Sequence, residues 1–337
     1  MTAGTRNGPD ALRVSAAGGD ERAFRALVER HSRALHVHCY RMLGSLHDAD
    51  DALQETLLRA WHGIDRYEPR APLRAWLYRI ATNVCLTMID RRRRQPHSTT
   101  GQAAWAGELI HLEPYPDQLL DELEEPSPGP EAQTATREHV ELAFITAVQL
   151  LPPKQRAALI LRDVLGWSAK EAATALADTV PAVNSALQRA RAGVERAQGL
   201  ELGAPGHRPA PGAERELLHR FMDAWDRVDI DGIVQLLTRD ALLAMPPAPG
   251  EVTGAEAIGA FLASVPAHGR LDQIRLVQTA ANNQPGLAAY VRDPTDGIHR
   301  AYGIMVLAIE RHRISGIVGC ADPSLFPPFG LPAELHP

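Results

Sequence analysis

An acidic, proline-rich segment at residues 96–136 constrains the folding of this chain more than any other feature of its sequence. Residues 99–136 carry eight Asp or Glu side chains and no Lys or Arg, whereas the flanking stretches 15–98 and 137–198 have net charges of +4 and +2. The six prolines of the segment are Pro96, Pro114, Pro116, Pro126, Pro128 and Pro130. Prolines interrupt helices and like charges repel, so this composition indicates a linker. The chain of 337 residues is therefore expected to form separate domains on its two sides.

A second linker is expected at residues 199–213, because the run GLELGAPGHRPAPG holds too much Gly and Pro for a helix or strand. The resulting segments are a helical domain at 15–95, the linker at 96–136, a second helical domain at 137–198, the linker at 199–213, a third domain at 214–325 and a tail at 326–337. No run of about 18 uncharged apolar residues and no signal-peptide core is visible, so no membrane span or export is expected. Three scattered cysteines without a CxxC pair favour a reducing cytoplasm.

The 15–95 segment predicts a loop followed by a helix that begins near Pro72 and ends in the run Arg91–Arg94. Such a loop and helix can hold unstacked bases against aromatic and amide groups. An alternative is that Trp76 belongs to the core and that the arginine run is a solvated basic end. The candidate contacts to nucleic acid are Tyr67, Arg70, Asn83, Arg91 and Arg92.

The 137–198 segment has the pattern of a helix-turn-helix. Ser168 and Glu171 predict a capping box that opens a short helix, and Thr179 is expected to cap a longer second helix with Pro181 in its first turn. Asn, Gln and Arg side chains can bond base edges in the major groove, while Ser and Arg fix phosphates. The candidates on the second helix are Asn184, Ser185, Gln188, Arg189 and Arg191. Any amphipathic helix also turns polar residues outward, so the pattern alone leaves DNA binding open.

The third domain predicts an α+β fold, in which helices come before a run of antiparallel strands that form one sheet curling over them. Helices are expected at Leu217–Trp225, at Ile230–Leu237 and at 254–264, and the strand signals lie in the runs LDQIRLVQTAAN, GLAAYVRD, RAYGIMVLAIER and RISGIVGCAD. The whole chain is therefore expected to be multidomain, with two all-α domains followed by one α+β domain.

Catalytic and metal-binding chemistry find little support in the sequence. An Asp with a His can do acid–base work, but no such pair stands at a discriminating spacing in the third domain. Asp229 and Asp231, in the run VDIDG, are expected to cap a helix. His36, His38 and Cys39 do not converge on a metal from positions i, i+2 and i+3 of a helix. No catalytic residue, metal or cofactor is therefore expected.

Two blocks of the sequence resemble the extracytoplasmic-function sigma factors of bacterial RNA polymerase, of the sigma-70 family. The runs DADDALQETLLRAW at 48–61 and PLRAWLYRIATNVCLTMIDRRRR at 72–94 resemble the clamp-binding and minus-ten segments of region 2. The runs LPPKQRAALILRDVLGWSAKEAATAL at 151–176 and TVPAVNSALQRAR at 179–191 are similar to region 4, which reads the minus-thirty-five element. The resemblance implies a factor that binds core RNA polymerase and directs transcription from chosen promoters.

This resemblance also implies roles for individual residues. Asp50, Asp51, Gln54 and Glu55 would bind the beta-prime clamp of the polymerase, and Tyr67, Arg70 and Asn83 would cradle a flipped base of the minus-ten element. The acidic linker would thread the positively charged channel of the polymerase. A plain spacer is an equally good interpretation of that linker.

The third domain resembles the SnoaL-like group of the NTF2-like fold, a cone-shaped α+β barrel. Its candidate ligand pocket contains Trp225, Tyr290 and Tyr302, the last of which can face either core or cavity. In sigma factors with such an extension, the domain is expected to modulate activity, with a small ligand or a regulatory protein as its candidate partner. The alternative is a SnoaL-like enzyme of cyclase, isomerase or hydratase type fused to a helix-turn-helix module, and a third hypothesis is a domain that recruits a protein without any ligand.

Overall fold

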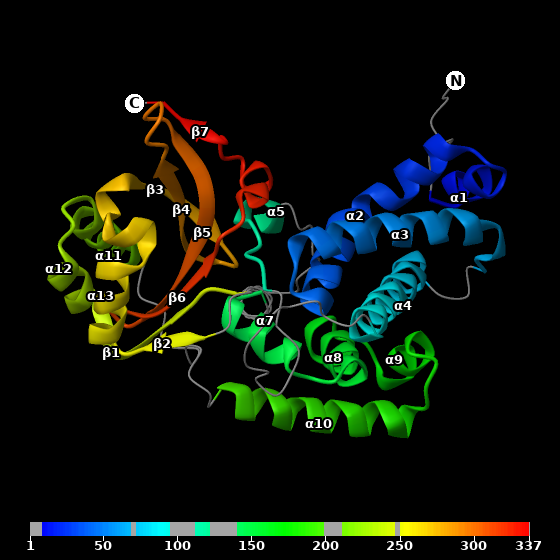
Figure 1. Ribbon diagram of the computed structural model, residues 1–337. Coiled ribbons are helices and arrows are strands. Elements are labelled where there is room, and N and C mark those ends of the chain that lie inside the picture. The colour runs from blue at the N-terminus through cyan, green and yellow to red at the C-terminus, as the bar shows by residue number, and fades with distance from the viewer. Residues whose placement is uncertain are drawn as a thin grey trace. The chain divides into compact units, whose positions relative to one another are not determined.

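A computed structural model of the chain (Figure 1) describes residues 9–68, 72–94, 112–121, 140–198, 211–246 and 250–336. The chain divides into two compact units. The first unit contains both helical domains, with residues 1–101, 119–132 and 148–194, and the second contains residues 102–118, 133–147 and 195–337. Two stretches of the region between the helical domains, 102–118 and 133–147, therefore belong to the same unit as the carboxyl-terminal domain.

The first helical domain is a bundle of α1 (Pro9–Ala17), α2 (Glu21–Leu43), α3 (Leu46–Gly63) and α4 (Leu73–Arg94). Asp20 caps α2 by accepting from the amides of Arg22 and Ala23, and Ser45 caps α3 by accepting from Asp48. Gly44 ends α2 in the left-handed conformation at φ 76°, which a glycine adopts without strain. Its amide bonds the carbonyl of Tyr40 at 2.7 Å, so the chain turns sharply from α2 into α3.

Small side chains bring α3 against the rest of the bundle. Its most buried residues are Ala49, Ala52, Thr56 and Ala60, all fully inaccessible, whereas Leu53, Leu57 and Trp61 are partly buried. The helical spacing of the larger residues predicts the buried side correctly but not the depth of burial, because alanines let the helix axes approach closely.

The second helical domain consists of α8 (Pro153–Leu159), one π-helical turn (Ile160–Val164), α9 (Ala169–Ala175) and α10 (Val180–Gln198). The predicted capping box is confirmed, since the Ser168 hydroxyl accepts from the Glu171 amide and the Glu171 carboxylate accepts from the Ser168 amide. Thr179 caps α10 by accepting from Ala182 at 3.3 Å. The α8 and α9 helices pack against α4 of the first domain. The helix α7 (Leu142–Gln149) comes before α8 in the same stretch of 137–198.

The carboxyl-terminal domain is α+β, as expected, with α11 (Pro211–Asp226), α12 (Ile230–Leu236) and α13 (Ala255–Ser264) beside one curved sheet (Figure 1). The strands are β1 (Leu237–Ala244), β2 (Glu251–Thr253), β3 (Ile274–Ala281), β4 (Gln284–Arg292), β5 (His299–Glu310), β6 (Arg313–Cys320) and β7 (Glu334–Leu335). Their order is β2-β1-β6-β5-β4-β3, with β7 paired to β5.

The sheet is mixed, because β1 pairs with β6 in parallel while the other pairs are antiparallel. The four strands that the sequence predicts, β3 to β6, pair antiparallel as expected, whereas the parallel pair involves β1, which the sequence does not predict. The run LTRDALLA of β1 follows α12 directly, with a burial pattern that does not alternate, so its sequence gives no period-two signal.

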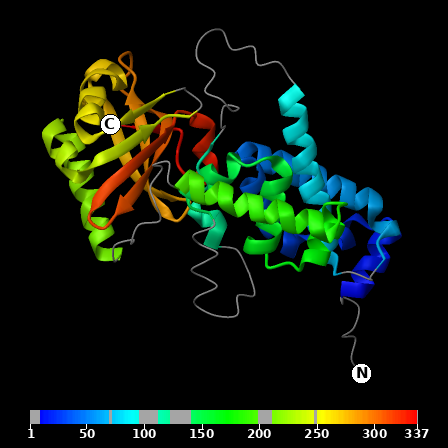
Figure 2. The same ribbon diagram turned by 90° about the horizontal axis from the view of Figure 1, so that it is seen from below.

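Both faces of the sheet are covered (Figure 2). The helices α11, α12 and α13 lie on one face, where Trp225, Leu287 and Leu307 belong to the main core. On the other face, Tyr290 packs against the turns that follow β6, and Phe326 and Phe329 of those turns are buried. The residues assigned to the tail by sequence are thus part of the folded domain.

The turn between β3 and β4 consists of Asn282 and Asn283, both with positive φ, 58° and 55°. Positive φ at both central residues is typical of a type I′ hairpin turn, for which asparagine is suited. Asn282 is fully buried, which is unusual for a turn residue. None of the described helices is long and apolar enough to cross a membrane.

Candidate nucleic-acid interface

The polar residues of α3 form an acidic stripe on the surface of the first unit. Asp51 and Gln54 are exposed, and Glu55 lies beside Arg59, whose Nε donates to its carboxylate at 2.6 Å. Asp50 is paired with the buried His36 through a 3.0 Å contact between Nε2 and Oδ1. This hydrogen bond holds the pKa of Asp50 below its usual value, so the carboxylate stays charged. The stripe therefore presents negative charge and amide groups to a basic partner.

The candidate minus-ten residues lie around the start and along the outside of α4. Tyr67 is largely buried, with its ring 5.0 Å from that of Trp76, and Asn83 is exposed, with its amide bonded to the Arg79 carbonyl at 2.9 Å. Arg91 and Arg92 are exposed at the end of the helix, where Arg92 also pairs with Asp48. Arg70 lies outside the described residues. Tyr67 and Trp76 thus share one aromatic contact, while Asn83 keeps a solvent-facing position on α4.

Four of the region 4 candidates lie together on the exposed side of α10. Asn184, Ser185, Gln188 and Arg189 are exposed, while Val183, Leu187 and Ala190 hold the opposite side of α10 in the core. This arrangement leaves their polar groups available to base edges and phosphates.

Arg191 differs from those four because it already has a partner. Its guanidinium makes two hydrogen bonds to the carboxylate of Asp163, at 2.8 and 2.7 Å. These bonds raise the pKa of Arg191 further above its usual value. Asp163 stands in the π-helical turn after α8, a local geometry that often marks functional positions. The sequence does not single out Asp163, because nothing in the run around it predicts a π turn.

The three candidate pocket residues of the carboxyl-terminal domain have three different surroundings. The buried Trp225 donates its indole N–H to the Ile274 carbonyl at 3.1 Å on the helix side of the sheet. Tyr290 is buried on the other face, where its hydroxyl donates to the Pro332 carbonyl at 3.0 Å, and burial raises its pKa. Tyr302 is 46% exposed at a bulge between β4 and β5. The structure does not bring these side chains together.

A short stretch of the acidic linker is docked on the carboxyl-terminal domain. Tyr115 is fully buried, and its amide donates to Asn282 Oδ1 at 2.7 Å while its carbonyl accepts from the Asn282 amide at 2.8 Å. Pro116 forms a β-bridge with Ala281, and the Asn283 amide donates to Asp117 Oδ1 at 2.8 Å. The main chain at 115–117 therefore continues the hydrogen bonding of the hairpin formed by β3 and β4.

The same turn also holds the chain at the other end of the linker. The side-chain nitrogen Nδ2 of Asn282 donates to the Val140 carbonyl at 2.6 Å, and Gln284 Oε1 accepts from the Leu142 amide at 3.0 Å. One buried asparagine thus bonds both Tyr115 and Val140. Composition alone does not predict this contact, because Asn282 and Tyr115 are 167 positions apart.

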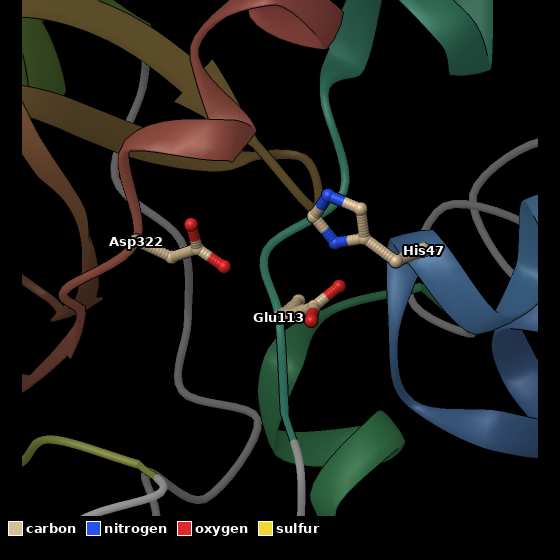
Figure 3. Close-up of side chains that lie close together, drawn as sticks. All are labelled: His47, Glu113 and Asp322. Atoms are coloured by element: carbon tan, nitrogen blue, oxygen red, sulfur yellow. The ribbon is translucent and has the colours of Figure 1, made fainter.

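Two carboxylates lie close together beside the docked stretch (Figure 3). Glu113 is 2% exposed, and one of its carboxylate oxygens lies within 4.8 Å of a carboxylate oxygen of Asp322, which follows β6. Burial, together with these two negative charges, raises the pKa of the neighbouring Cys320 thiol to about 12. Cys320 is therefore a protonated thiol at neutral pH. Figure 3 also draws His47, which belongs to the other unit.

The fold and these surfaces define a multidomain DNA-binding factor, and comparison with known proteins gives its family. Residues 27–95 match Sigma-70 region 2, residues 141–192 match Sigma-70 region 4, and residues 218–317 match the SnoaL-like domain. The ECF RNA polymerase sigma factor SigG of Mycobacterium tuberculosis is 41% identical over 94% of this chain and 86% of its own length. The RNA polymerase sigma factor CnrH of Cupriavidus metallidurans is 37% identical over 54% of this chain and 89% of its own length.

A solved structure shows the same fold. The extracytoplasmic function sigma factor SigJ of Mycobacterium tuberculosis matches with a TM-score of 0.59 and 23% identity, over 90% of this chain and 98% of that chain. The protein therefore belongs to the extracytoplasmic-function sigma factors of the sigma-70 family and carries a SnoaL-like domain at its carboxyl-terminal end. As such a factor, it binds core RNA polymerase and directs transcription initiation at promoter DNA.

Proposed function

We propose that the SnoaL-like domain of this sigma factor controls transcription by holding the linker between regions 2 and 4. The proposal rests on Asn282, because the side chain of this one buried residue bonds the main chain at Tyr115 and at Val140. A buried amide whose donor and acceptor are both used is a specific contact, since each lost bond leaves a buried polar group unsatisfied.

The docking shortens the tether that joins the two DNA-reading regions. Between Arg94 and Val140 a fully extended chain reaches roughly 160 Å, but between Arg94 and Tyr115 it reaches only roughly 70 Å. When Asn282 holds Tyr115 and Val140 together, the chain between them no longer contributes to the reach. The docked linker therefore restrains how far region 2 and region 4 can separate.

The surfaces of the sigma regions support a finer assignment of partners. The acidic stripe of α3 with Asp50, Asp51, Gln54 and Glu55 is suited to the beta-prime clamp of core polymerase. Tyr67, Arg70, Asn83, Arg91 and Arg92 would bind the minus-ten element, and the exposed residues of α10 would read the minus-thirty-five element. Because these partners are found in the cytoplasm, we propose that the factor works there.

The carboxyl-terminal domain works without catalysis in this proposal. Asp229, which the sequence predicts as a helix cap, accepts from the Gly232 amide at 2.8 Å at the start of α12. Trp225 and Tyr290 use their polar atoms on main-chain carbonyls. A small ligand or a regulatory protein that displaces the docked linker would act as an inducer.

The test is transcription by core polymerase with the Asn282→Gly variant. Glycine accepts the positive φ of the turn but removes both side-chain bonds to the linker. Asn283→Gly is the matched control, because it changes the same turn and keeps the main-chain bond to Asp117. We expect Asn282→Gly to give several-fold more promoter-specific transcript than the wild type and the control. Equal amounts from all three chains would refute control through the linker.

A further inference from the structure

One ion pair inside region 4 joins α10, the helix expected to read DNA, to the turn that follows α8. The guanidinium of Arg191 donates through Nε to Asp163 Oδ2 at 2.8 Å and through Nη2 to Asp163 Oδ1 at 2.7 Å. Both carboxylate oxygens are therefore engaged, in the parallel geometry that is among the strongest available to an arginine. The two residues are 28 positions apart, so this contact is made by the fold of region 4 and not by helical spacing.

The π-helical turn holds the carboxylate of Asp163 beside α10. In this turn, Ile160–Val164, the chain closes through the Leu165 amide, which bonds the Ile160 carbonyl at 2.9 Å, five residues back. A π turn contains one residue more than an α-helical turn and is found frequently at functional sites. The side chain of Asp163 is 29% exposed, so its carboxylate lies at the surface of region 4 and not in the core.

Arg191 lies on the side of α10 that carries two of the candidate base-reading residues. Asn184, Gln188 and Arg191 stand at positions i, i+4 and i+7, which fall on one face of a helix, and all three are exposed. On a recognition helix the first residues reach base edges, whereas an arginine further along is placed for the phosphates. The position of Arg191 therefore suits a phosphate contact.

Arg189 gives the contrast on the same helix. Its side chain is exposed and makes no hydrogen bond or ion pair with the residues that the structure describes. Arg191, two positions further along, is held by a carboxylate that carries the opposite charge. The two charges of this pair cancel at a point of the surface where a free arginine would attract DNA.

A carboxylate and a phosphate bind an arginine in the same way, because both offer two oxygens to the parallel N–H groups of the guanidinium. A DNA phosphate that binds Arg191 must therefore displace Asp163. The displaced carboxylate would then stand near the DNA backbone and repel its phosphates. Asp163 thus competes with DNA for Arg191.

We propose that Arg191 is a site for a DNA phosphate which the chain itself occupies with Asp163, so that this carboxylate lowers the affinity of region 4 for DNA of any sequence. The proposal rests on the proposed function only in taking α10 as the helix that enters DNA. Each phosphate that a protein neutralises releases counterions and makes binding depend more steeply on salt. While the pair is closed, region 4 makes one such contact fewer, and base-reading side chains account for a larger part of its binding.

The test is binding of promoter duplex by the full-length chain in complex with core polymerase, measured across a salt series. Asp163→Asn keeps the size of the side chain and removes its charge, so Arg191 becomes available to a phosphate. We expect this variant to bind about five- to tenfold more tightly than the wild type at about 0.1 M salt, and the plot of log affinity against log salt to become steeper by about one. Weaker binding, or an unchanged slope, would show that the pair supports only the fold and would overturn the proposal.

A double variant shows whether the gain comes through Arg191. In a chain that carries Arg191→Ala, we expect Asp163→Asn to leave the salt slope unchanged, because no guanidinium remains to bind the phosphate. Glu195→Gln is the matched control, since it removes an exposed carboxylate from the same helix, one turn beyond Arg191. A steeper slope that persists without Arg191, or an equal gain from Glu195→Gln, would reveal a general effect of charge and refute the phosphate site.

The Arg189→Ala variant, measured beside these, separates this proposal from the proposed function. Tighter binding by Asp163→Asn, with Arg189→Ala binding like the wild type, would uphold the phosphate site and refute base reading by Arg189. Weaker binding by Arg189→Ala, with Asp163→Asn behaving like the wild type, would refute the phosphate site and uphold α10 as the reader of the minus-thirty-five element.

Discussion

Two arginines on α10 lie two positions apart and have different surroundings. Arg189 is exposed on the side of α10 that carries Asn184, Ser185 and Gln188, whereas Arg191 is bound by both carboxylate oxygens of Asp163. An arginine in a bidentate pair has to give up that pair to bind a base, which offsets part of what the base contact would contribute.

Arg189→Ala should therefore weaken promoter binding more than Arg191→Ala. A bidentate base contact contributes about 1–3 kcal/mol, and we expect Arg189→Ala to lose that amount and to relax specificity in the minus-thirty-five element. Binding of the polymerase complex to labelled promoter, measured across a salt series with each variant, checks this. A larger loss from Arg191→Ala would show that the pair with Asp163 opens on DNA.

The buried His38 makes the stability of the folded chain depend on pH. Its Nε2 lies 2.9 Å from the Thr82 hydroxyl, and full burial, with the nearby Arg41 charge, lowers its pKa to about 3. The folded chain keeps this imidazole neutral, whereas the unfolded chain takes up a proton near pH 6.5. The stability from His38 is thus present above about pH 6.5 and is lost as the pH falls toward 3.

His38→Gln should make unfolding less sensitive to acid. Between pH 6.5 and 4.5 the wild type loses up to about 1.4 kcal/mol per pH unit through this residue, and the variant loses none of that amount. Urea unfolding of both full-length chains at pH 7.5, 6.5, 5.5 and 4.5 measures the difference. His31, whose pKa is lowered to about 4, contributes equally to both chains. Parallel pH profiles would contradict the account of His38.

At the scale of elements, the turn between β3 and β4 contacts the linker at Tyr115 and Val140. Amide hydrogen exchange can measure whether this contact protects the linker. The Tyr115 amide is bonded to the Asn282 side chain, and the Val140 carbonyl accepts from the same side chain. We expect Asn282→Gly to speed amide exchange in the peptides 112–121 and 140–147, because both lose a buried bond. Peptides of α3 serve as an internal control, and unchanged exchange at 112–121 would show that Asn282 does not hold the linker.

The sequence predicts those elements whose signals are local. The capping box of Ser168 and Glu171, the cap at Thr179 and the helix cap at Asp229 are read from residues three positions apart or fewer, and the structure confirms them. The pair of Arg191 with Asp163 depends on a π turn, and the docking of Tyr115 depends on a turn 167 positions away. Neither leaves a pattern in its own segment, so composition indicates only a spacer at 112–118.

At the scale of the whole molecule, the boundary between the two compact units falls within α7. The helix belongs to both compact units, since residues up to Ala147 fall in the second and those from Val148 in the first. Gln284 holds the Leu142 amide at its beginning, and Gln149 at its end bonds the Arg41 carbonyl of α2. The helix has eight residues.

The central claim is that this chain is a sigma factor restrained by its own carboxyl-terminal domain, and transcription in vitro tests it most directly. Core polymerase and a promoter library would be supplied with either the full chain or a chain ending after residue 204. Regions 2 and 4 form a compact unit of their own, so the shorter chain keeps both DNA-reading regions. The account predicts promoter-specific transcripts from both chains and several-fold more from the shorter one. Absence of specific transcripts from both chains, or equal amounts from the two, would contradict it.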